Sequence, residues 1–299
     1  MAHKIPKLSL TNLLQNDIHS IDLLSNALTN HGFFVITDHG IPFTLFNKAY
    51  EYSEKFFNLE TSLKNTYSYR EYAGARGYTP FGKETALGET VPDLKEFWHH
   101  GPVIDSSFDK RIMRNISVSE IQEFNHIFDN LFNEMNSLGS KLLTSISLTL
   151  GLPFDYFKES TEKGNSLLRL IHYPPSNNEN IYRAREHADI NLITLLIGAN
   201  EPGLEVKDKS NNWIPVSSSY DDIVCNIGDM MQLITDQKLR STPHRVVKYK
   251  TEEPKSRYSI PFFMHPSPDT ILKSVFNDDD DGVLAHDFLD ERLKAIKLY

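Results

Sequence analysis

Hydrophobic residues follow a helical spacing through most of the first half of the chain. The longest stripe runs from residue 119 to residue 150, and apolar positions there recur every three or four residues, as on one face of an α-helix. Ser119 is a candidate N-cap, because Gln122 follows three residues later as in a capping box. Four shorter stripes predict further helices, at 17–30, 43–57, 154–161 and 287–298.

After residue 160 the pattern changes to short apolar runs separated by turns. Glycine, proline and asparagine interrupt the runs, for example at 200–203 and 208–212. Short strands with frequent turns are typical of an all-β sandwich or barrel. The eight expected strands lie near 167–173, 190–197, 203–206, 213–216, 222–227, 230–235, 243–249 and 257–264.

Composition narrows the class of protein. The 299 residues are 39% hydrophobic and 24% charged, with a formal net charge of −9, which is ordinary for a soluble protein. The negative charge argues against a nucleic-acid-binding surface and an anionic membrane partner. The chain shows no apolar run of membrane-spanning length and no signal-peptide core, so we expect a cytoplasmic protein. Cys225 is the single cysteine, and we expect a buried, inert thiol that forms no internal disulfide.

Two histidines and one aspartate form a candidate metal site. His187 and Asp189 are two residues apart, so on a strand both side chains point to the same face. His244 lies on another expected strand, which must be brought alongside. Two imidazoles and one carboxylate are the facial triad that suits Fe(II) and leaves coordination positions open. Catalytic zinc uses the same ligand types, so the residues alone also allow a zinc hydrolase.

A candidate anion site follows at Arg257 and Ser259. These residues also alternate on one strand and share a face. A guanidinium group beside a hydroxyl can hold a carboxylate by charge-assisted hydrogen bonds. The pattern therefore predicts a carboxylate-bearing ligand near the metal.

The spacing His187-x-Asp189, His244 and Arg257-x-Ser259 resembles the signature of the Fe(II)/2-oxoglutarate-dependent dioxygenases, in the branch related to isopenicillin N synthase. Further blocks resemble that family in the same order and cover nearly the whole chain. They are His31–Pro42, Asp93–Trp98, Leu170–Pro175, Pro202–Val206, Asn226–Gln232, Ser241–Val246 and Arg257–Phe263. The chain departs from the plant pattern at Ile171, where many members have asparagine.

The resemblance implies an α+β fold with a mainly β core. The core would be a double-stranded β-helix, or jelly roll, over residues 161–268. An N-terminal helical and mixed region, 1–160, and a C-terminal acidic loop and helix, 269–299, would flank it. The implied activity couples oxidative decarboxylation of 2-oxoglutarate by O₂ to hydroxylation or another C–H oxidation of a small molecule.

The resemblance also implies roles for individual residues. Fe(II) would be held by His187, Asp189 and His244. The distal carboxylate of 2-oxoglutarate would be held by Arg257, Ser259 and Tyr173. Candidate substrate residues come from the aromatic-rich segment 67–102 and the last core strand, and they are Arg76, Tyr78, Lys95 and Phe263.

Three alternatives stay open. An oxidase of the isopenicillin N synthase type uses Fe(II) and O₂ without 2-oxoglutarate, and its relatives retain the Arg-x-Ser pair for a substrate carboxylate. A zinc hydrolase would need a general base, and the chain has no His-Glu-x-x-His helix. An inactive binding protein is disfavoured because the three ligands and the arginine are all intact.

Other polar residues are expected to be structural. His31 and His39 flank an expected strand, and His172 is expected to be partly exposed. His99 and His100 are adjacent on a strand, so they point to opposite faces and cannot easily share an ion.

Two charged features have a plainer explanation on the surface. For Lys95 and Glu96, the alternative to a place near the substrate is a plain surface ion pair, a weak interaction. Asp278–Asp281 is expected to be a solvated loop, since a calcium-binding loop would need spaced ligands and a final glutamate.

Overall fold

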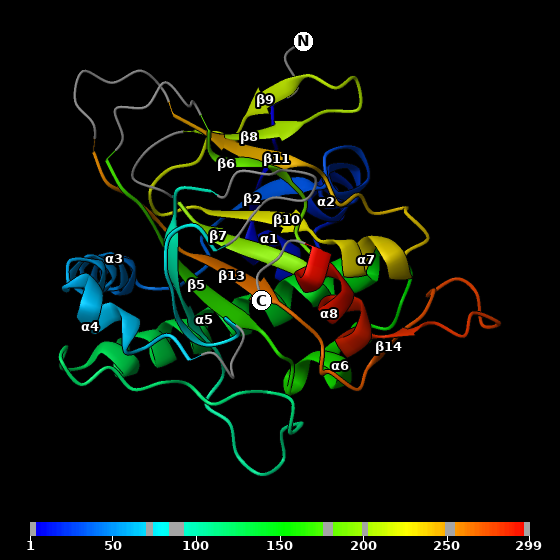
Figure 1. Ribbon diagram of the computed structural model, residues 1–299. Coiled ribbons are helices and arrows are strands. Elements are labelled where there is room, and N and C mark those ends of the chain that lie inside the picture. The colour runs from blue at the N-terminus through cyan, green and yellow to red at the C-terminus, as the bar shows by residue number, and fades with distance from the viewer. Residues whose placement is uncertain are drawn as a thin grey trace.

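The computed structural model describes residues 4–69, 74–83, 93–175, 182–198, 203–248 and 255–295 (Figure 1). Its helices are α1 (Leu10–Leu14), α2 (Ile18–Asn30), α3 (Phe43–Phe57), α4 (Thr61–Asn65), α5 (Phe124–Thr149), α6 (Lys158–Glu162), α7 (Asp229–Ile234) and α8 (Ala285–Ala295). Its strands in the N-terminal part are β1 (Lys7–Ser9), β2 (Phe33–Thr37), β3 (Gly77–Thr79) and β4 (Glu96–His100). The remaining strands are β5 (Leu167–Tyr173), β6 (Tyr182–His187), β7 (Ile193–Ile197), β8 (Leu204–Lys207), β9 (Trp213–Pro215), β10 (Ile223–Ile227), β11 (His244–Val247), β12 (Arg257–Ser259), β13 (Pro261–Met264), β14 (Ile271–Leu272) and β15 (Val283–Leu284).

Two β-sheets stack to form the body of the molecule. The main sheet has the order β1-β2-β10-β7-β13-β5-β4-β3, and β12 also pairs with β5. The second sheet has the order β6-β11-β8-β9 and lies above the central strands in Figure 1. An apolar cluster of Phe33, Val35, Val206 and Val224 joins the two sheets. The arrangement agrees with the predicted jelly roll.

Helix α5 packs on the other side of the main sheet, where its apolar stripe is buried. Gly139 lets the helix approach β13, since a Cβ there would lie 2.5 Å from the Met264 Sδ. The predicted start at Ser119 is wrong, because the helix begins at Phe124 after Glu123, which has a φ of 65°. The Asn125 side chain instead secures the preceding segment, accepting from the Val118 amide and donating to the Ile116 carbonyl.

Residues 230–235 were predicted as a strand, and the structure corrects this to helix α7. The amides of Asp229 and Met230 donate to the carbonyls of Asp189 and Ile190, so the chain turns back onto the candidate metal segment. Met230, Met231 and Ile234 are then buried on one helical face. The single strand expected at 257–264 is divided into β12 and β13, and β6 was not predicted.

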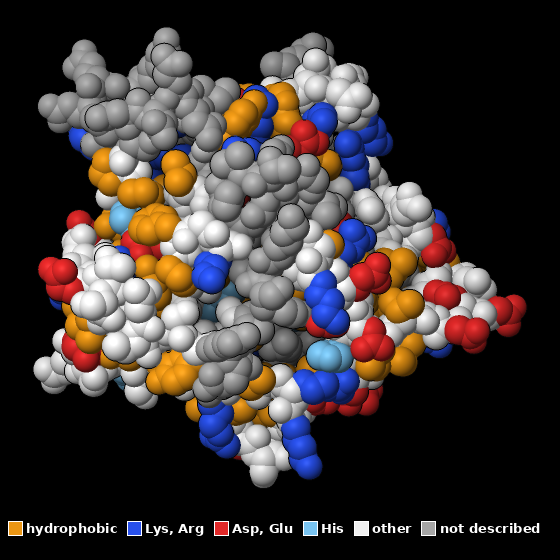
Figure 2. All heavy atoms as spheres, in the orientation of Figure 1, with side chains coloured by type: hydrophobic (Ala, Val, Ile, Leu, Met, Phe, Trp, Pro, Cys, Tyr) orange, Lys and Arg blue, Asp and Glu red, His pale blue; other side chains and the backbone are white. Residues whose placement is uncertain are grey.

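The acidic run is exposed, as predicted. Asp278, Asp279 and Asp281 are exposed, and acidic side chains gather on the loop that projects at the right of Figure 2. Asp280 is half-buried and accepts from the Ser274 amide. Helix α8 follows this loop and ends at Ala295, while the predicted end of the helix, near 298, lies outside the described residues. In the described part of the chain, no helix is both long and apolar enough to cross a membrane.

Candidate metal centre and co-substrate site

Strand pairing places four predicted site residues, Tyr173, Arg257, Ser259 and Phe263, on the face of the main sheet that looks toward the second sheet. Residues that are directly opposite on paired strands share a face. Arg257 is opposite Tyr173 and Ser259 is opposite Ile171 on β12 and β5. Phe263 on β13 is opposite Thr194 on β7, which bonds to Asp189. We call this face the inner face.

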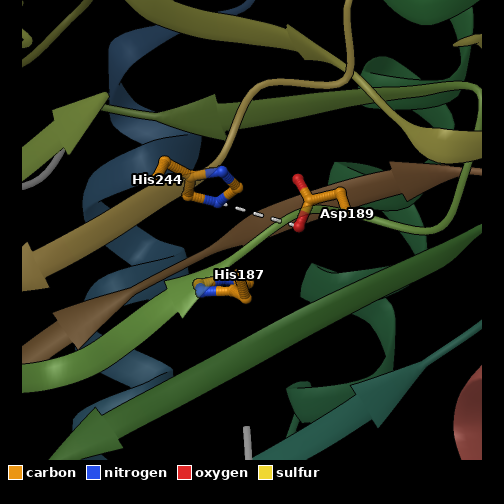
Figure 3. A group of neighbouring side chains, drawn as sticks. All are labelled: His187, Asp189 and His244. Atoms are coloured by element: carbon orange, nitrogen blue, oxygen red, sulfur yellow. Dashed lines mark ion pairs between the residues drawn. The ribbon is translucent and has the colours of Figure 1, made fainter. Parts of the chain in front are cut away.

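The three candidate ligands converge at one point between the sheets (Figure 3). His187 ends β6 and His244 begins β11, and the two residues are directly paired with ring centroids 4.4 Å apart. The Asp189 Oδ1 lies 3.8 Å from the His244 Nε2. One possible ligand atom from each residue lies within 4.8 Å of the others. The predicted triad is therefore brought together by the fold.

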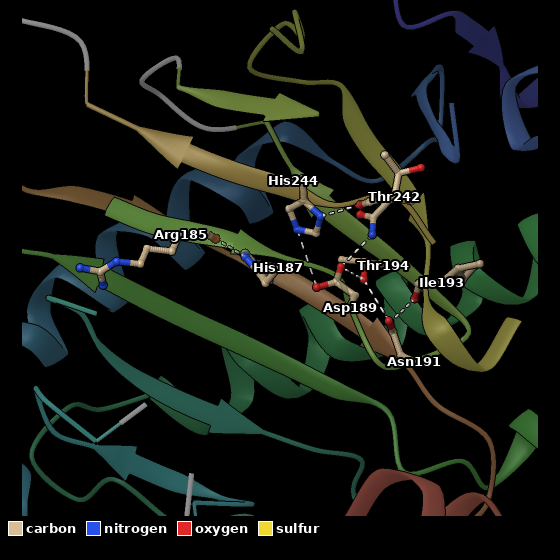
Figure 4. A network of polar contacts seen from close by, with 9 residues as sticks. Arg185, His187, Asp189, Asn191, Ile193, Thr194, Thr242 and His244 are labelled. Carbon is tan, nitrogen blue, oxygen red and sulfur yellow. Dashed lines mark hydrogen bonds and ion pairs between the residues drawn. The ribbon is translucent and has the colours of Figure 1, made fainter. Parts of the chain in front are cut away.

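Backbone carbonyls orient both imidazoles (Figure 4). The Nδ1 of His187 lies 2.7 Å from the Arg185 carbonyl oxygen, and the Nδ1 of His244 lies 3.2 Å from that of Thr242. A carbonyl oxygen only accepts, so each Nδ1 carries the proton and donates. Each Nε2 is then left with its lone pair, which is the form that binds a metal.

Two side-chain donors fix the Asp189 carboxylate through its Oδ2 atom. Its Oδ2 accepts from the Thr194 hydroxyl at 2.6 Å and from the Asn226 side-chain amide at 2.7 Å. Burial by itself would raise the pKa of Asp189, but His244, His187 and these two donors together lower it. The aspartate is therefore ionised, and its Oδ1 lies toward His244.

The electrostatics favour metal binding over proton binding at His187. Burial lowers the pKa of His187 to about 4, and the nearby charges of His244 and Lys95 lower it further than Asp189 raises it. His187 is thus a neutral imidazole at neutral pH. Two imidazoles and an ionised carboxylate fit Fe(II). In the described part of the chain, no other group of three such side chains could hold a metal ion.

We expect the metal-free protein to lose stability as the pH falls from about 6.5 to about 4. Burial is the main cause that lowers the pKa of His265 to about 4, with Asp189 opposing and Arg76 adding to it. The unfolded chain takes up this proton below pH 6.5 and the folded chain does not, so His265 alone contributes about 1.4 kcal/mol per pH unit. Denaturant unfolding at pH 7, 6 and 5 measures the slope. His265→Asn should reduce it, whereas His19→Asn, at an exposed position on α2, should not. An equal slope in His265→Asn and the unaltered protein would contradict the expectation.

The candidate 2-oxoglutarate residues lie deep in the inner face. Arg257 is 1% exposed, and Ser259 and Tyr173 are also buried. The guanidinium carbon of Arg257 lies 5.4 Å from the centre of the Tyr173 ring. A buried guanidinium next to a hydroxyl and a phenol suits a carboxylate that enters from the metal side.

The four candidate substrate residues divide into two groups. Phe263 lies on the inner face, and Lys95, one residue before β4, is buried with its charge acting on His187. Tyr78 does not face the site, because it is opposite Trp98 on β4 and its hydroxyl donates to Glu96 among core residues. Arg76 is buried at the edge of the sheet, and its guanidinium packs against Gly101.

Sequence reasoning missed several residues that shape the site. Asn226 and Thr194 hold Asp189, and Arg169 is half-buried on the inner face between the rings of Phe97 and Phe263. The position of Arg169 could have been predicted, because residues 169, 171 and 173 are two apart on one strand and therefore share a face. The two partners of Asp189 carried no comparable signal.

Two predictions about polar residues near the site are wrong. His172 is buried, at 8% exposed, because it lies on the face of β5 opposite to the inner face. Lys95 and Glu96 are both buried and do not pair with each other. Lys95 instead pairs with Asp93 at 3.1 Å, and Glu96 pairs with Lys64 at 2.7 Å.

Comparison with sequence families identifies both halves of the chain. Residues 164–266 match the 2OG-Fe(II) oxygenase superfamily. Residues 5–119 match the family described as non-haem dioxygenase in morphine synthesis N-terminal. Proline hydroxylase buaE of Petromyces alliaceus is 31% identical, over 83% of this chain and 82% of that protein. Gibberellin 20 oxidase 1 of Arabidopsis thaliana is 28% identical, over 90% of this chain and 71% of that protein.

Solved structures of similar proteins support the same family assignment. A 2OG-Fe(II) oxygenase family protein from Caulobacter crescentus superposes with a TM-score of 0.89 and 36% identity, over 99% of this chain and 100% of that one. A full-length Neurospora crassa protein in complex with alpha-KG gives a TM-score of 0.86 and 25% identity, over 97% and 96% of the two chains. The same Neurospora protein has been crystallised with alpha-KG and thymine.

These relatives confirm the double-stranded β-helix and do not favour the zinc hydrolase or the oxidase that works without 2-oxoglutarate. The chain therefore belongs to the 2OG-Fe(II) oxygenase family and is a 2-oxoglutarate-dependent dioxygenase whose cofactor is Fe(II).

Proposed function

We propose that His187, Asp189 and His244 hold the Fe(II), and that Arg257, Ser259 and Tyr173 bind the distal carboxylate of 2-oxoglutarate. The observation that carries the first assignment is the convergence of two proton-free Nε2 atoms and one carboxylate oxygen within 4.8 Å. The second rests on the placement of Arg257 opposite Tyr173 on the inner face, which looks toward the sheet that carries His187 and His244.

The second substrate, in this proposal, is a small organic molecule. It lies on the inner face beside the triad, where Phe263 and Arg169 are half-buried and therefore partly open. Lys95, whose charge acts on His187, borders the same space. The Neurospora relative forms a complex with thymine, and this supports a small organic molecule as the substrate here. Tyr78 has no part in the proposed pocket, since it faces the core.

Each residue of the proposed site has its own role in the reaction. Bound Fe(II) would supply the redox chemistry that couples oxidative decarboxylation of 2-oxoglutarate, to succinate and CO₂, with oxidation of a substrate C–H bond. Thr194 and Asn226 hold the Asp189 carboxylate so that its Oδ1 faces the metal position. Arg257 neutralises and orients the distal carboxylate of the co-substrate. The burial of Arg257, Ser259 and Tyr173 excludes water from that end of the site.

An anaerobic titration tests the assignment. Apo-protein is titrated with Fe(II) and then with 2-oxoglutarate, and visible absorption is followed. We expect a weak metal-to-ligand charge-transfer band, because a 2-oxo acid chelates Fe(II) through its keto oxygen and adjacent carboxylate. Binding of Fe(II) without a band would overturn the 2-oxoglutarate assignment. Failure to bind Fe(II) would overturn the triad.

A further inference from the structure

A buried carboxylate lies behind the proposed 2-oxoglutarate site, on the face of the main sheet opposite to the inner face. We call this the outer face. Glu96 on β4 is 1% exposed. Its Oε2 accepts from Lys64 at 2.7 Å and from the Tyr78 hydroxyl at 2.6 Å, and its Oε1 lies 2.7 Å from the His172 Nδ1. Burial alone would raise the pKa of Glu96, but these three donors lower it. The site is therefore an ionised carboxylate with three partners.

His172 connects this carboxylate to both neighbours of Arg257. Its Nε2 lies 3.0 Å from the Ser256 hydroxyl oxygen. Its ring stacks on Tyr258 with centroids 5.0 Å apart and planes inclined by 17°. The His172 ring also contacts Phe57 of α3, with centroids 5.4 Å apart, and Phe57 in turn contacts Tyr258. The residues on either side of Arg257 are thus both held by one side chain.

The consequence for Arg257 follows from strand geometry. Arg257 points to the inner face, while Tyr258 points to the outer face and is directly opposite His172 on β5. Strand β12 has three residues, and among the described strands its partner is β5, so contacts of the flanking side chains also help to fix its backbone. A shift of Ser256 or Tyr258 would move the Arg257 Cα, and a small displacement of a binding group is costly.

We propose that His172 is a positioning residue for 2-oxoglutarate binding, which acts by fixing Ser256 and Tyr258 and hence the direction of Arg257. The inference rests on the proposed role of Arg257. It adds that the contacts on the outer face, from Glu96 through His172 to Ser256 and Tyr258, set the affinity of the inner-face site for 2-oxoglutarate. His172 itself touches neither the co-substrate nor the metal.

A pair of histidine substitutions tests the inference. His172→Phe keeps a ring for stacking but removes the bonds to Glu96 and Ser256. His100→Phe is the matched control, because His100 is also fully buried on the outer face, at the other end of β4, and its Nε2 also bonds a carboxylate, that of Asp129, at 2.7 Å. Fe(II) affinity is measured by anaerobic calorimetry, and 2-oxoglutarate affinity from the charge-transfer band of the Fe(II) protein.

We expect His172→Phe to raise the dissociation constant of 2-oxoglutarate about tenfold, as for other supporting shells of binding sites, with Fe(II) affinity unchanged. His100→Phe should leave both affinities within about twofold, whatever it costs in stability. An unchanged 2-oxoglutarate affinity in His172→Phe, or an equal loss in both variants, would overturn the inference.

A milder variant keeps the test decisive if His172→Phe does not fold. Ser256→Ala removes one hydrogen bond at a half-buried position, and we expect it to weaken 2-oxoglutarate binding at least about threefold. No change in Ser256→Ala would then overturn the inference. Failure of the proposed function is distinguishable, because in that case the unaltered protein would give no charge-transfer band at all.

Discussion

Replacing Asp189 by alanine is expected to abolish iron-dependent turnover without unfolding the protein. The substitution removes the one anionic member of the proposed triad, and loss of a ligand should cost more than the 10- to 100-fold typical of outer-shell partners, so we expect turnover to fall at least about 1,000-fold. The Thr194 hydroxyl and the Asn226 amide lose their acceptor, which costs about 1–3 kcal/mol of stability. Succinate formation, Fe(II) binding and denaturant unfolding measure the three quantities.

Two controls separate charge from shape. Asp189→Asn keeps the volume and an acceptor for Thr194 but removes the negative charge, so it should remain folded and still lose most of its iron affinity. Asp278→Ala, in the exposed acidic loop, should leave turnover unchanged. Full activity in Asp189→Ala would remove Asp189 from the site.

The second large effect is expected from Arg257→Ala. Truncating one partner of a buried charge pair costs at least 2 kcal/mol, and about 3 kcal/mol corresponds to a rise of about 100-fold in the 2-oxoglutarate requirement. Fe(II) binding should not change, because Arg257 is not among the residues that converge on the metal position. The KM for 2-oxoglutarate and the charge-transfer titration both report the effect.

Arg257→Lys tests whether geometry or charge matters. Lysine keeps the positive charge but loses the planar fork, so its affinity should lie between those of the alanine variant and the unaltered protein. Arg111→Ala, which removes a guanidinium paired with Asp109 away from the site, is the control. A 2-oxoglutarate requirement that is unchanged in Arg257→Ala would favour an oxidase of the isopenicillin N synthase type.

The sequence by itself determined the elements and residue sets whose signal is local. The stripe of α5 could be predicted because a 3.6-residue period describes one helix without knowledge of its neighbours. The shared face of Arg257 and Ser259 follows from a period of two along β12. Asp189, in contrast, lies beyond the end of β6, so the prediction that it shares a strand with His187 is wrong and the fold brings the two side chains together by another route. Ordered blocks along the chain then identified the family, which the relatives confirmed.

Only the tertiary structure decided which residues meet across the sheets. Helix α7 was predicted as a strand because a short apolar run is compatible with either a helix or a strand. Its backbone contacts with Asp189 and Ile190 form only in the folded protein, and there the segment is a helix. Tyr78 and Lys95 both belong to the aromatic-rich segment, but strand pairing sends Tyr78 to the core, whereas Lys95 lies one residue before β4 and its charge acts on His187. The bond from Asn226 to Asp189, and the bonds of His172, join residues far apart in sequence. Such contacts depend on register between strands, which no local pattern specifies.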